Sequence, residues 1–481
     1  MDYTLLILTN CFQDIQGLQI SEEHAARNWG EAGIVVEEES CTMEITGASV
    51  ALSRTVEEVL VRANLPYEMD GFQKQTLNAL ATEKSVILSA SCGSGKFVIA
   101  YIAVEILRIE ARIPMGVGIL LVPLNAMMEE FSRTYPDIAT LSMSGELSVH
   151  MSDLITGRVR LLIAHAESFV TPKGKLILEQ LEEEEVLIFV CLDECDKFTS
   201  GQWGGVHFRD EMRSIPSSIR AKCADPSSPC LAMTATLTPM EEKEVQEILC
   251  IEECDLVRIK VSPIQNHLSL VKVRRPNSVK GKLSSEGQLL APGDIHLVDR
   301  LALNEFSKCI DSGNFDSFKK TLVFTFSNEG CALNDMLCER HPNIPSHEKP
   351  WIFLHSKIDD VTVDSFNNRI MEGKAKVIIC TSTLLMGVNL PFYDVMIMLG
   401  PYSHLNDLQQ AWGRVGRRFE GKKRRQSLAY ICYNNMTLSR IATQEVKDFC
   451  DTNMCLKQFV NEAFGNTTIP SGKDRCCSNC D

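Results

Sequence analysis

Short apolar runs recur along the first half of the chain, and longer stretches of mixed polarity separate them. Each run is almost continuously hydrophobic, which is typical of strands buried on both faces of a parallel sheet. After the first run, residues 97–112 have apolar positions at helical spacing. The pattern therefore predicts alternating strands and helices, with strands over residues 85–90, 117–122, 159–164, 186–192 and 230–234.

The same alternation restarts in the second half, with apolar runs at residues 321–325, 351–354, 376–380, 394–398 and 427–433. Residues 262–300 lie between the two sets and are rich in Pro, Ser, Asn and Lys, which predicts a linker and surface excursion. The sequence thus predicts an α/β fold with two tandem parallel-sheet domains. We expect an acidic N-terminal extension over 1–61, a first domain over 62–262, a second over 263–445 and a small helical, Cys-rich tail over 446–481.

Composition limits where the protein works and what it binds. The formal net charge of −15 excludes a protein that is basic throughout, so a polyanion site has to be a local patch. The basic run at 417–425 is a candidate for that patch, and a solvated charge run or a localisation signal is the alternative. The 19 cysteines, many inside apolar runs, favour a reducing compartment. No run approaches the ~18 apolar residues of a membrane span, and the N-terminus is not a secretory signal. We expect a soluble intracellular protein, in the nucleus, the cytoplasm or both.

A glycine-rich loop, SASCGSGK at residues 89–96, follows the first predicted strand and precedes a helix. A phosphate-binding P-loop requires this order of strand, loop and helix. The backbone N–H groups would hold phosphates, and Lys96 would contact the β- and γ-phosphates. Phe97 replaces the hydroxyl residue that normally holds Mg²⁺, and a glycine-rich turn without a ligand is the alternative. The predicted nucleotide-binding residues of this segment are Ser91, Cys92, Gly93, Ser94, Gly95, Lys96 and Phe97.

Two further groups of residues fit phosphoryl-transfer chemistry. Asp193 and Glu194 follow a buried strand, where P-loop enzymes place an Asp that holds Mg²⁺ and where a second carboxylate can polarise water. An acidic helix cap is the alternative. Arg414 and Arg417 lie in the second predicted domain, and arginines presented from a second domain can stabilise the transition state.

Together these residues resemble a helicase of superfamily 2. DECD at 193–196 resembles the DEAH/DECH box, and TAT at 234–236 resembles the motif that couples ATP state to nucleic-acid binding. TLLMGVNLP at 383–391 resembles a second-domain interface motif, and QAWGRVGR at 410–417 fits the signature Q-x-x-G-R-x-G-R, which adds Gln410 to the predicted catalytic residues. The resemblance implies two RecA-like domains with ATP and Mg²⁺ in the cleft between them, Mg²⁺ being held by Asp193.

Within this superfamily the chain is most similar to RecQ-type DNA helicases. QWG at 202–204 and FR at 208–209 resemble the aromatic-rich loop that senses single-stranded DNA in RecQ enzymes, with longer spacing here. Bases can stack on such aromatic faces, although a core aromatic is the alternative for the tryptophan. FQKQ at 72–75 resembles the adenine-contacting segment, which makes Gln75 the candidate for that contact. The predicted DNA-binding residues are Gln202, Trp203, Phe208, Arg209 and His355, the last in a segment similar to the family's Y-H-S turn.

The tail resembles the four-cysteine zinc module that follows the second domain in RecQ proteins. Cys455 matches the first ligand, and Cys477 and Cys480 form a C-x-x-C pair whose spacing lets two thiolates bind one zinc ion. The fourth family ligand would lie beyond Asp481. Cys476, Cys450 or a water could replace it, and a metal-free tail is the alternative.

The RecQ resemblance implies an ATP-dependent 3′–5′ DNA helicase in repair or recombination. ATP, Mg²⁺ and zinc would be its cofactors, and single-stranded DNA and duplex junctions its partners. Two other functions stay open. Phe97 favours an impaired, helicase-like scaffold or regulator that binds DNA or ATP, and an RNA helicase is the third alternative. QWG followed by FR, together with the cysteine tail, argues against RNA.

Overall fold

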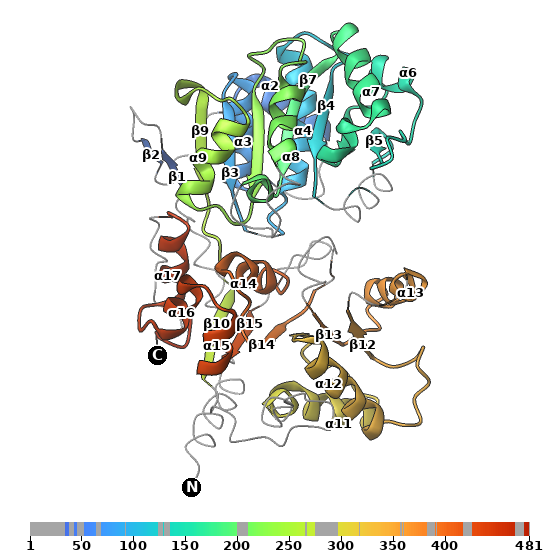
Figure 1. Cartoon of the computed structure of the whole chain (residues 1–481), viewed down its shortest axis with the longest axis vertical. Helices are drawn as coiled ribbons and strands as arrows, with labels where there is room; N and C mark the ends of the chain where they lie inside the picture. The colour runs from blue at the N-terminus through green and yellow to red at the C-terminus, as the bar shows by residue number, and fades with distance from the viewer. Residues whose placement is uncertain are drawn as a thin grey trace.

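Two β-sheets, one in each half of the chain, organise the computed structural model into a first and a second lobe (Figure 1). Residues 261–267 join the last strand of one sheet to the first strand of the other, and the described part 261–264 is called the connector. The structure describes residues 34–37, 43–45, 52–63, 69–91, 93–123, 128, 135–199, 210–264, 267–274, 297–316, 318–355, 358, 360–381, 390, 392–416, 426–466 and 476–480.

The first lobe contains a nine-stranded sheet with the order β2-β1-β9-β3-β8-β7-β4-β6-β5. Its strands are parallel from β9 to β5, and β1 and β2 add an antiparallel pair at the β9 edge. The strands are β1 (Ile34–Glu37), β2 (Met43–Ile45), β3 (Ser85–Ser89), β4 (Val117–Leu121), β5 (Ile138–Leu141), β6 (Leu161–Ala164), β7 (Leu187–Asp193), β8 (Cys230–Thr234) and β9 (Leu256–Lys260).

Both faces of this sheet are covered, because alternate residues of each strand point to opposite faces. In β3, Val86 and Leu88 join the core under α2–α4, while Ile87 joins the core under α6–α9. The helices are α2 (Arg54–Ala63), α3 (Gly71–Ala81), α4 (Lys96–Glu110), α6 (Met151–Ile155), α7 (Pro172–Glu183), α8 (Asp210–Arg220) and α9 (Pro239–Ile248), with short helices η1 (Ala166–Val170), η2 (Cys195–Phe198) and η3 (Glu253–Asp255).

The second lobe contains a six-stranded, wholly parallel sheet with the order β10-β15-β14-β11-β13-β12. In β11, Val323 faces a core with α11 and α12, and Leu322 and Phe324 face a core with α13–α17. The strands are β10 (Leu268–Arg274), β11 (Thr321–Phe324), β12 (Trp351–Leu354), β13 (Val377–Cys380), β14 (Val395–Leu399) and β15 (Ser427–Tyr433). The helices are η4 (Asp299–Leu303), α11 (Asn304–Ser312), α12 (Ser327–Arg340), α13 (Asp360–Met371), α14 (Leu405–Trp412), α15 (Asn435–Ile441), α16 (Gln444–Asp451) and α17 (Leu456–Ala463).

The predicted architecture of two tandem parallel-sheet domains and a helical Cys-rich tail is confirmed, and every strand predicted from an apolar run is present. The interpretation of residues 262–300 as a linker is wrong for 268–274, which form β10. This strand lies at the edge of its sheet and carries Lys272 and Arg274, so its composition resembles that of a surface segment. No helix in the described part of the chain is long and apolar enough to cross a membrane.

Candidate nucleotide site and cysteine centre

The glycine-rich loop joins the end of β3 to the start of α4, as the sequence predicts. Lys96, the first residue of α4, is largely buried, and its Nζ donates hydrogen bonds to the carbonyl oxygens of Ala90 at 3.0 Å and Ser91 at 3.4 Å. The ammonium group is therefore held against the backbone of the loop at the helix N-terminus, where backbone N–H groups favour anions. Cys92 lies outside the described residues.

Gln73 of α3 fixes this loop from its other side. Its Nε2 donates to the carbonyl oxygens of Ser94 at 3.1 Å and Gly95 at 3.3 Å, while its Oε1 accepts the N–H of Asp70 at 2.8 Å. Gly95 has φ of +80°, and a Cβ there would lie 2.7 Å from Gln73 Nε2. The positive φ therefore favours glycine, and a Cβ at this position would push the Gln73 amide away from the loop carbonyl oxygens.

The sequence predicts Gln75 as the adenine contact and misses Gln73. The signal for Gln73 is its place three residues after Asp70, which forms a capping box at the start of α3. Gln75 lies on the same helix, and its Oε1 is buried without a hydrogen-bond partner among the described residues. An unpaired buried amide oxygen is costly, so Gln75 stays a prediction for a ligand contact.

Phe97 belongs to the hydrophobic core of the first lobe. Its ring centroid lies 5.7 Å from that of Tyr135, which in turn lies 4.7 Å from the ring of Tyr101. Phe97 therefore stabilises the start of α4 by packing and supplies no oxygen for Mg²⁺. Ser94, in the loop, has a buried Oγ without a hydrogen-bond partner in the described part of the chain.

Asp193 and Glu194 lie at the carboxyl end of β7, two strands away from the P-loop strand. The backbone of Glu194 is left-handed (φ of +48°), and its N–H donates to Asp193 Oδ1 at 3.0 Å. Burial and the neighbouring Glu194 carboxylate raise the pKa of Asp193 to about 7, while the Lys96 ammonium acts to lower it. The structure thus brings the predicted metal ligand into the electrostatic field of the P-loop lysine.

Thr234 is the last residue of β8, the strand beside β7, and its hydroxyl links the end of β8 to the acidic turn after β7. Its hydroxyl donates to Asp196 Oδ1 at 2.6 Å and lies 3.5 Å from Glu194 Oε2. It also accepts the backbone N–H of Thr236 at 3.1 Å. Asp196 is fully buried and pairs with Lys197 at 2.9 Å. The two predicted motifs are therefore one hydrogen-bonded unit.

In the second lobe, α14 lies on the side nearest the first lobe (Figure 1). Burial raises the pKa of Asp407 on this helix, and Lys197 of the first lobe acts to lower it. Gln410 and Arg414, at the end of α14 and in the turn after it, are both buried. The Gln410 Oε1 has no hydrogen-bond partner among the described residues. Arg417 lies outside them.

Most of the predicted DNA-binding residues cannot be placed on this framework. Gln202, Trp203, Phe208 and Arg209 lie outside the described residues, as do 382–389 and the basic run at 417–425. His355 follows β12, is half-buried, and packs its ring 4.8 Å from that of Phe353. Its contact with DNA remains a prediction.

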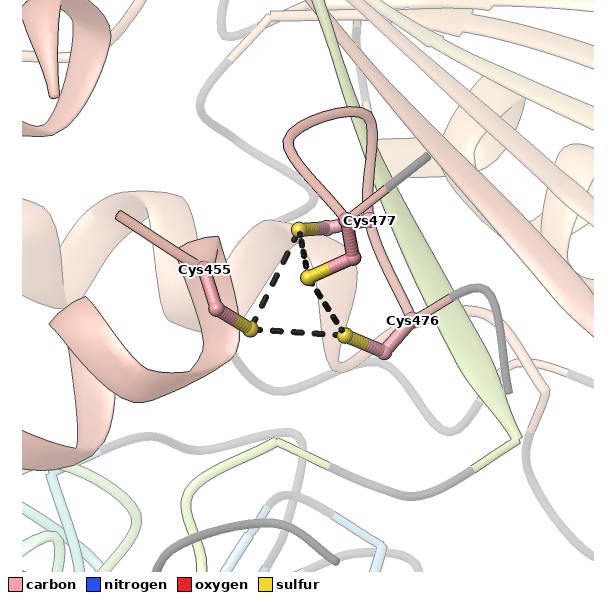
Figure 2. Close-up of side chains that lie close together, drawn as sticks. Cys455, Cys476 and Cys477 are labelled. Atoms are coloured by element: carbon pink, nitrogen blue, oxygen red, sulfur yellow. Dashed lines mark hydrogen bonds between the residues drawn. The ribbon is translucent and has the colours of Figure 1, made fainter. Parts of the chain in front are cut away.

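Cysteine sulfurs converge after the second lobe. Cys455, at the N-terminus of α17, meets Cys476, Cys477 and Cys480, and the four sulfurs lie within 4.8 Å of one another. Figure 2 shows three of these side chains pointing toward a common centre. The S···S distance is 3.3 Å between Cys455 and Cys476 and 4.0 Å between Cys455 and Cys477. Zinc with four thiolates at ~2.3 Å separates its sulfurs by about 3.8 Å, so the cluster fits a tetrahedral ion.

The structure therefore unites the three predicted ligands and adds Cys476 as the fourth. The other substitute, Cys450, is buried in α16 and is not part of the cluster. The backbone N–H of Leu456 donates to the sulfur of Cys477 at 3.3 Å, the kind of contact that stabilises a thiolate at a helix N-terminus.

Comparison with known proteins agrees with this geometry. Residues 70–245 match the family described as DEAD/DEAH box helicase, and residues 302–419 match the helicase conserved C-terminal domain. The ATP-dependent RNA helicase has1 of Aspergillus niger is 24% identical over 376 residues, covering 74% of this chain and 54% of has1. The ATP-dependent DNA helicase Q-like 2 of Arabidopsis thaliana is 24% identical over 357 residues, covering 72% of this chain and 44% of that protein.

Among solved structures, the DUF1998 helicase MrfA bound to DNA is similar with a TM-score of 0.59 and 13% identity, over 88% of this chain and 56% of that one. The likeness shows the fold alone, and it agrees with two tandem RecA-like domains. The chain spans about half the length of the curated relatives it matches.

Proposed function

We propose that this chain, whose two domain matches indicate a helicase of superfamily 2, is an ATP-dependent DNA helicase of RecQ type that moves 3′ to 5′. The ATP site is supported by one observation. Four residues lie together at the carboxyl ends of neighbouring parallel strands: Lys96, Asp193, Glu194 and Thr234. Ligands of open α/β sheets bind at this edge.

The residues present fit ATP with Mg²⁺, apart from position 97. ATP supplies the phosphoryl group that is transferred to water. Lys96 and the loop N–H groups hold the phosphates, Asp193 holds the metal, directly or through water, and Glu194 accepts a proton from the attacking water. Arg414 and Arg417, with Gln410, act from the second lobe on the developing charge.

The coupling to nucleic acid runs through the end of β8 in this proposal. Thr234 holds Asp196 and reaches Glu194, so a movement of this segment alters the group that orients the water. Closing and opening the lobes around ATP would then ratchet a single strand across both lobes.

Two features together lead us to propose DNA and not RNA as the substrate. The aromatic segment QWG with FR offers stacking faces, and a four-cysteine centre follows the second lobe. Both features resemble those of RecQ proteins.

The relatives include helicases named for RNA and for DNA, so the nucleic-acid substrate is the first property to measure. ATP hydrolysis by the full chain should rise with single-stranded DNA and much less with RNA of the same length. Stimulation by RNA alone would exclude the DNA assignment. We place the activity in DNA repair or recombination, in the nucleus or the cytoplasm.

A second candidate is a scaffold that binds ATP or DNA but hydrolyses slowly. The observation that favours it is the burial of Phe97 against Tyr135, which leaves the usual Mg²⁺ hydroxyl missing. Turnover that stays at the level of a Lys96→Ala variant, with or without DNA, would favour this candidate.

The cysteine centre is proposed to hold one zinc ion through Cys455, Cys476, Cys477 and Cys480. Zinc supplies no chemistry there, because four thiolates close a structural site. The full chain purified without chelator should contain one zinc per chain by elemental analysis. Cys476→Ser should lower that content, whereas Cys450→Ser, at a cysteine outside the cluster, should not. Equal zinc in both variants would remove Cys476 from the ligand set.

A further inference from the structure

Helix α17 reaches beyond the second lobe and contacts the first. Gly465 follows this helix with φ of +65°, and a Cβ there would lie 3.0 Å from Pro239 Cγ and 3.7 Å from Lys260 Nζ. Pro239 begins α9 and Lys260 ends β9, and both belong to the first lobe. Figure 1 shows α17 next to the lower edge of that lobe. The end of α17 therefore packs against the first lobe, and a Cβ at position 465 would make a tight contact with Pro239.

The same helix also holds the connector. Ser262 Oγ donates to Asn461 Oδ1 of α17 at 3.1 Å, and Asn461 is buried. On another side, Gln409 Nε2 of α14 donates to the carbonyl oxygen of Pro263 at 2.9 Å. The connector thus lies between α17 and α14, the helix that carries Gln410 and ends just before Arg414.

The segment around Cys476 and the C-terminus of α16 are attached to β10 of the second sheet. The Leu270 N–H of β10 donates to the carbonyl oxygen of Cys476 at 3.3 Å, and the Ser478 N–H donates to that of Leu270 at 3.0 Å. Lys272 Nζ donates to the carbonyl oxygens of Cys450 at 2.9 Å and Thr452 at 2.6 Å, at the C-terminus of α16. The cysteine module, defined as α16, α17 and residues 476–480, is therefore anchored on β10.

We propose that metal binding by the four cysteines makes the cysteine module a bracket that ties the connector and the start of α9 in the first lobe to the second lobe on one side of the molecule. Cys455 stands at the start of α17, and the other three ligands stand on the segment that pairs with β10. A metal bond between them fixes α17 to the second sheet, and the far end of α17 then fixes the connector and Pro239. This inference rests on the proposed zinc site and adds a role for it in setting the position of α14 against the first lobe.

Hydrogen exchange of the full, zinc-loaded chain, before and after removal of zinc by a chelator, tests the bracket. The expected result is faster exchange in three places: the amides of β10, the connector, and the first turn of α9 in the first lobe. Helix α11 lies on the opposite face of the second sheet from the module and should be unchanged. A rise confined to β10 and the module would overturn the bracket while leaving the zinc site intact. A chain that contains no zinc would overturn both.

Alanine substitutions at Gly465 and Gly313 distinguish the effect of the contact with Pro239 from the effect of backbone strain. Gly465→Ala places a methyl group against Pro239, whereas a methyl group added at Gly313, with φ of +67° at the end of α11, would have no atom within 4 Å. Gly313→Ala therefore carries the same backbone cost without the clash. Gly465→Ala should keep one zinc per chain and speed exchange in the first turn of α9, and Gly313→Ala should leave that turn unchanged. Identical exchange of this turn in the two variants would contradict the proposal.

Discussion

The hydroxyl of Thr234 donates a 2.6 Å hydrogen bond to the carboxylate of Asp196, and both side chains are fully buried. The bond joins the end of β8 to the turn that follows β7, beside Glu194, the proposed base. A shift of either strand end would therefore move the other.

Thr234→Val keeps the shape of this side chain and removes the bond. Asp196 and the Thr236 N–H each lose a buried partner, which should cost about 1–3 kcal/mol of stability. We expect nucleotide binding to persist and the stimulation of ATP hydrolysis by DNA to fall. The measurement is turnover with and without DNA, alongside the denaturation midpoint. Thr321→Val is the control, because Thr321 is also buried and its hydroxyl donates to the carbonyl oxygen of Lys319, away from the acidic turn. Equal DNA stimulation in both variants would contradict the coupling role.

Gln73 and Gln75 should have separable effects. Gln73→Ala removes the two bonds to the loop carbonyl oxygens, so binding of ATP and GTP should both weaken about tenfold, as the loss of ~1.4 kcal/mol implies. Gln75→Ala should weaken ATP alone, because the contact predicted for Gln75 is with adenine. Titration with fluorescent analogues of both nucleotides tests this, and an unchanged affinity in Gln73→Ala would show that the loop needs no such support.

The raised pKa of Asp193 predicts a dependence of metal binding on pH. The carboxyl keeps its proton to about pH 7 in the fold, whereas the unfolded chain releases it near pH ~4. The folded state thus binds the extra proton between these values, and this group's contribution to stability falls as pH rises through the window. Mg²⁺ requires the carboxylate, so the apparent Mg²⁺ affinity of the nucleotide complex should fall by up to about tenfold per unit below pH ~7.

Mg²⁺ titrations across this range, in the wild type and in Asp193→Asn, check the prediction. The variant has no proton to lose at this position, so it reports the titration of the nucleotide itself. Parallel pH profiles in the two proteins would show that Asp193 does not bind the metal.

Phe97→Thr tests whether the loop is impaired. The change restores a hydroxyl but removes the ring that packs against Tyr135, which should cost about 3 kcal/mol. Phe97→Ala creates a similar cavity without the hydroxyl and is the matched control. We expect tighter Mg²⁺ binding and faster turnover in the threonine variant than in the alanine variant. Equal rates in the two would show that Mg²⁺ is held without a group at this position.

Continuous apolar runs predict most of the buried parallel strands, because a sheet covered on both faces favours apolar residues at every position, but they miss β5 and β9, whose sequences include Thr140 and Arg258. The edge strand β10 is also missed, since it needs apolar residues only where helices cover it and uses Lys272 to bind the end of α16. Spacing found Lys96 and the Asp193–Glu194 pair. Spacing marks Gln73 as a capping residue of α3 but does not show its contact with Gly95, because that contact joins residues 22 apart through tertiary packing. Likewise, Cys476 and Cys477 lie in a segment that pairs with β10, and the sequence does not show that this pairing accompanies the approach of both sulfurs to Cys455.

Strand separation on tailed duplexes tests the central claim most directly. The full chain with ATP and Mg²⁺ is mixed with a DNA duplex carrying a 3′ single-stranded tail, the same duplex with a 5′ tail, and the matching 3′-tailed RNA duplex. Lys96→Ala serves as the inactive control. The account predicts ATP-dependent separation of the 3′-tailed DNA alone, abolished in the variant. Separation of RNA only, or of the 5′-tailed DNA only, would contradict it, as would separation of the 3′-tailed DNA that persists in Lys96→Ala.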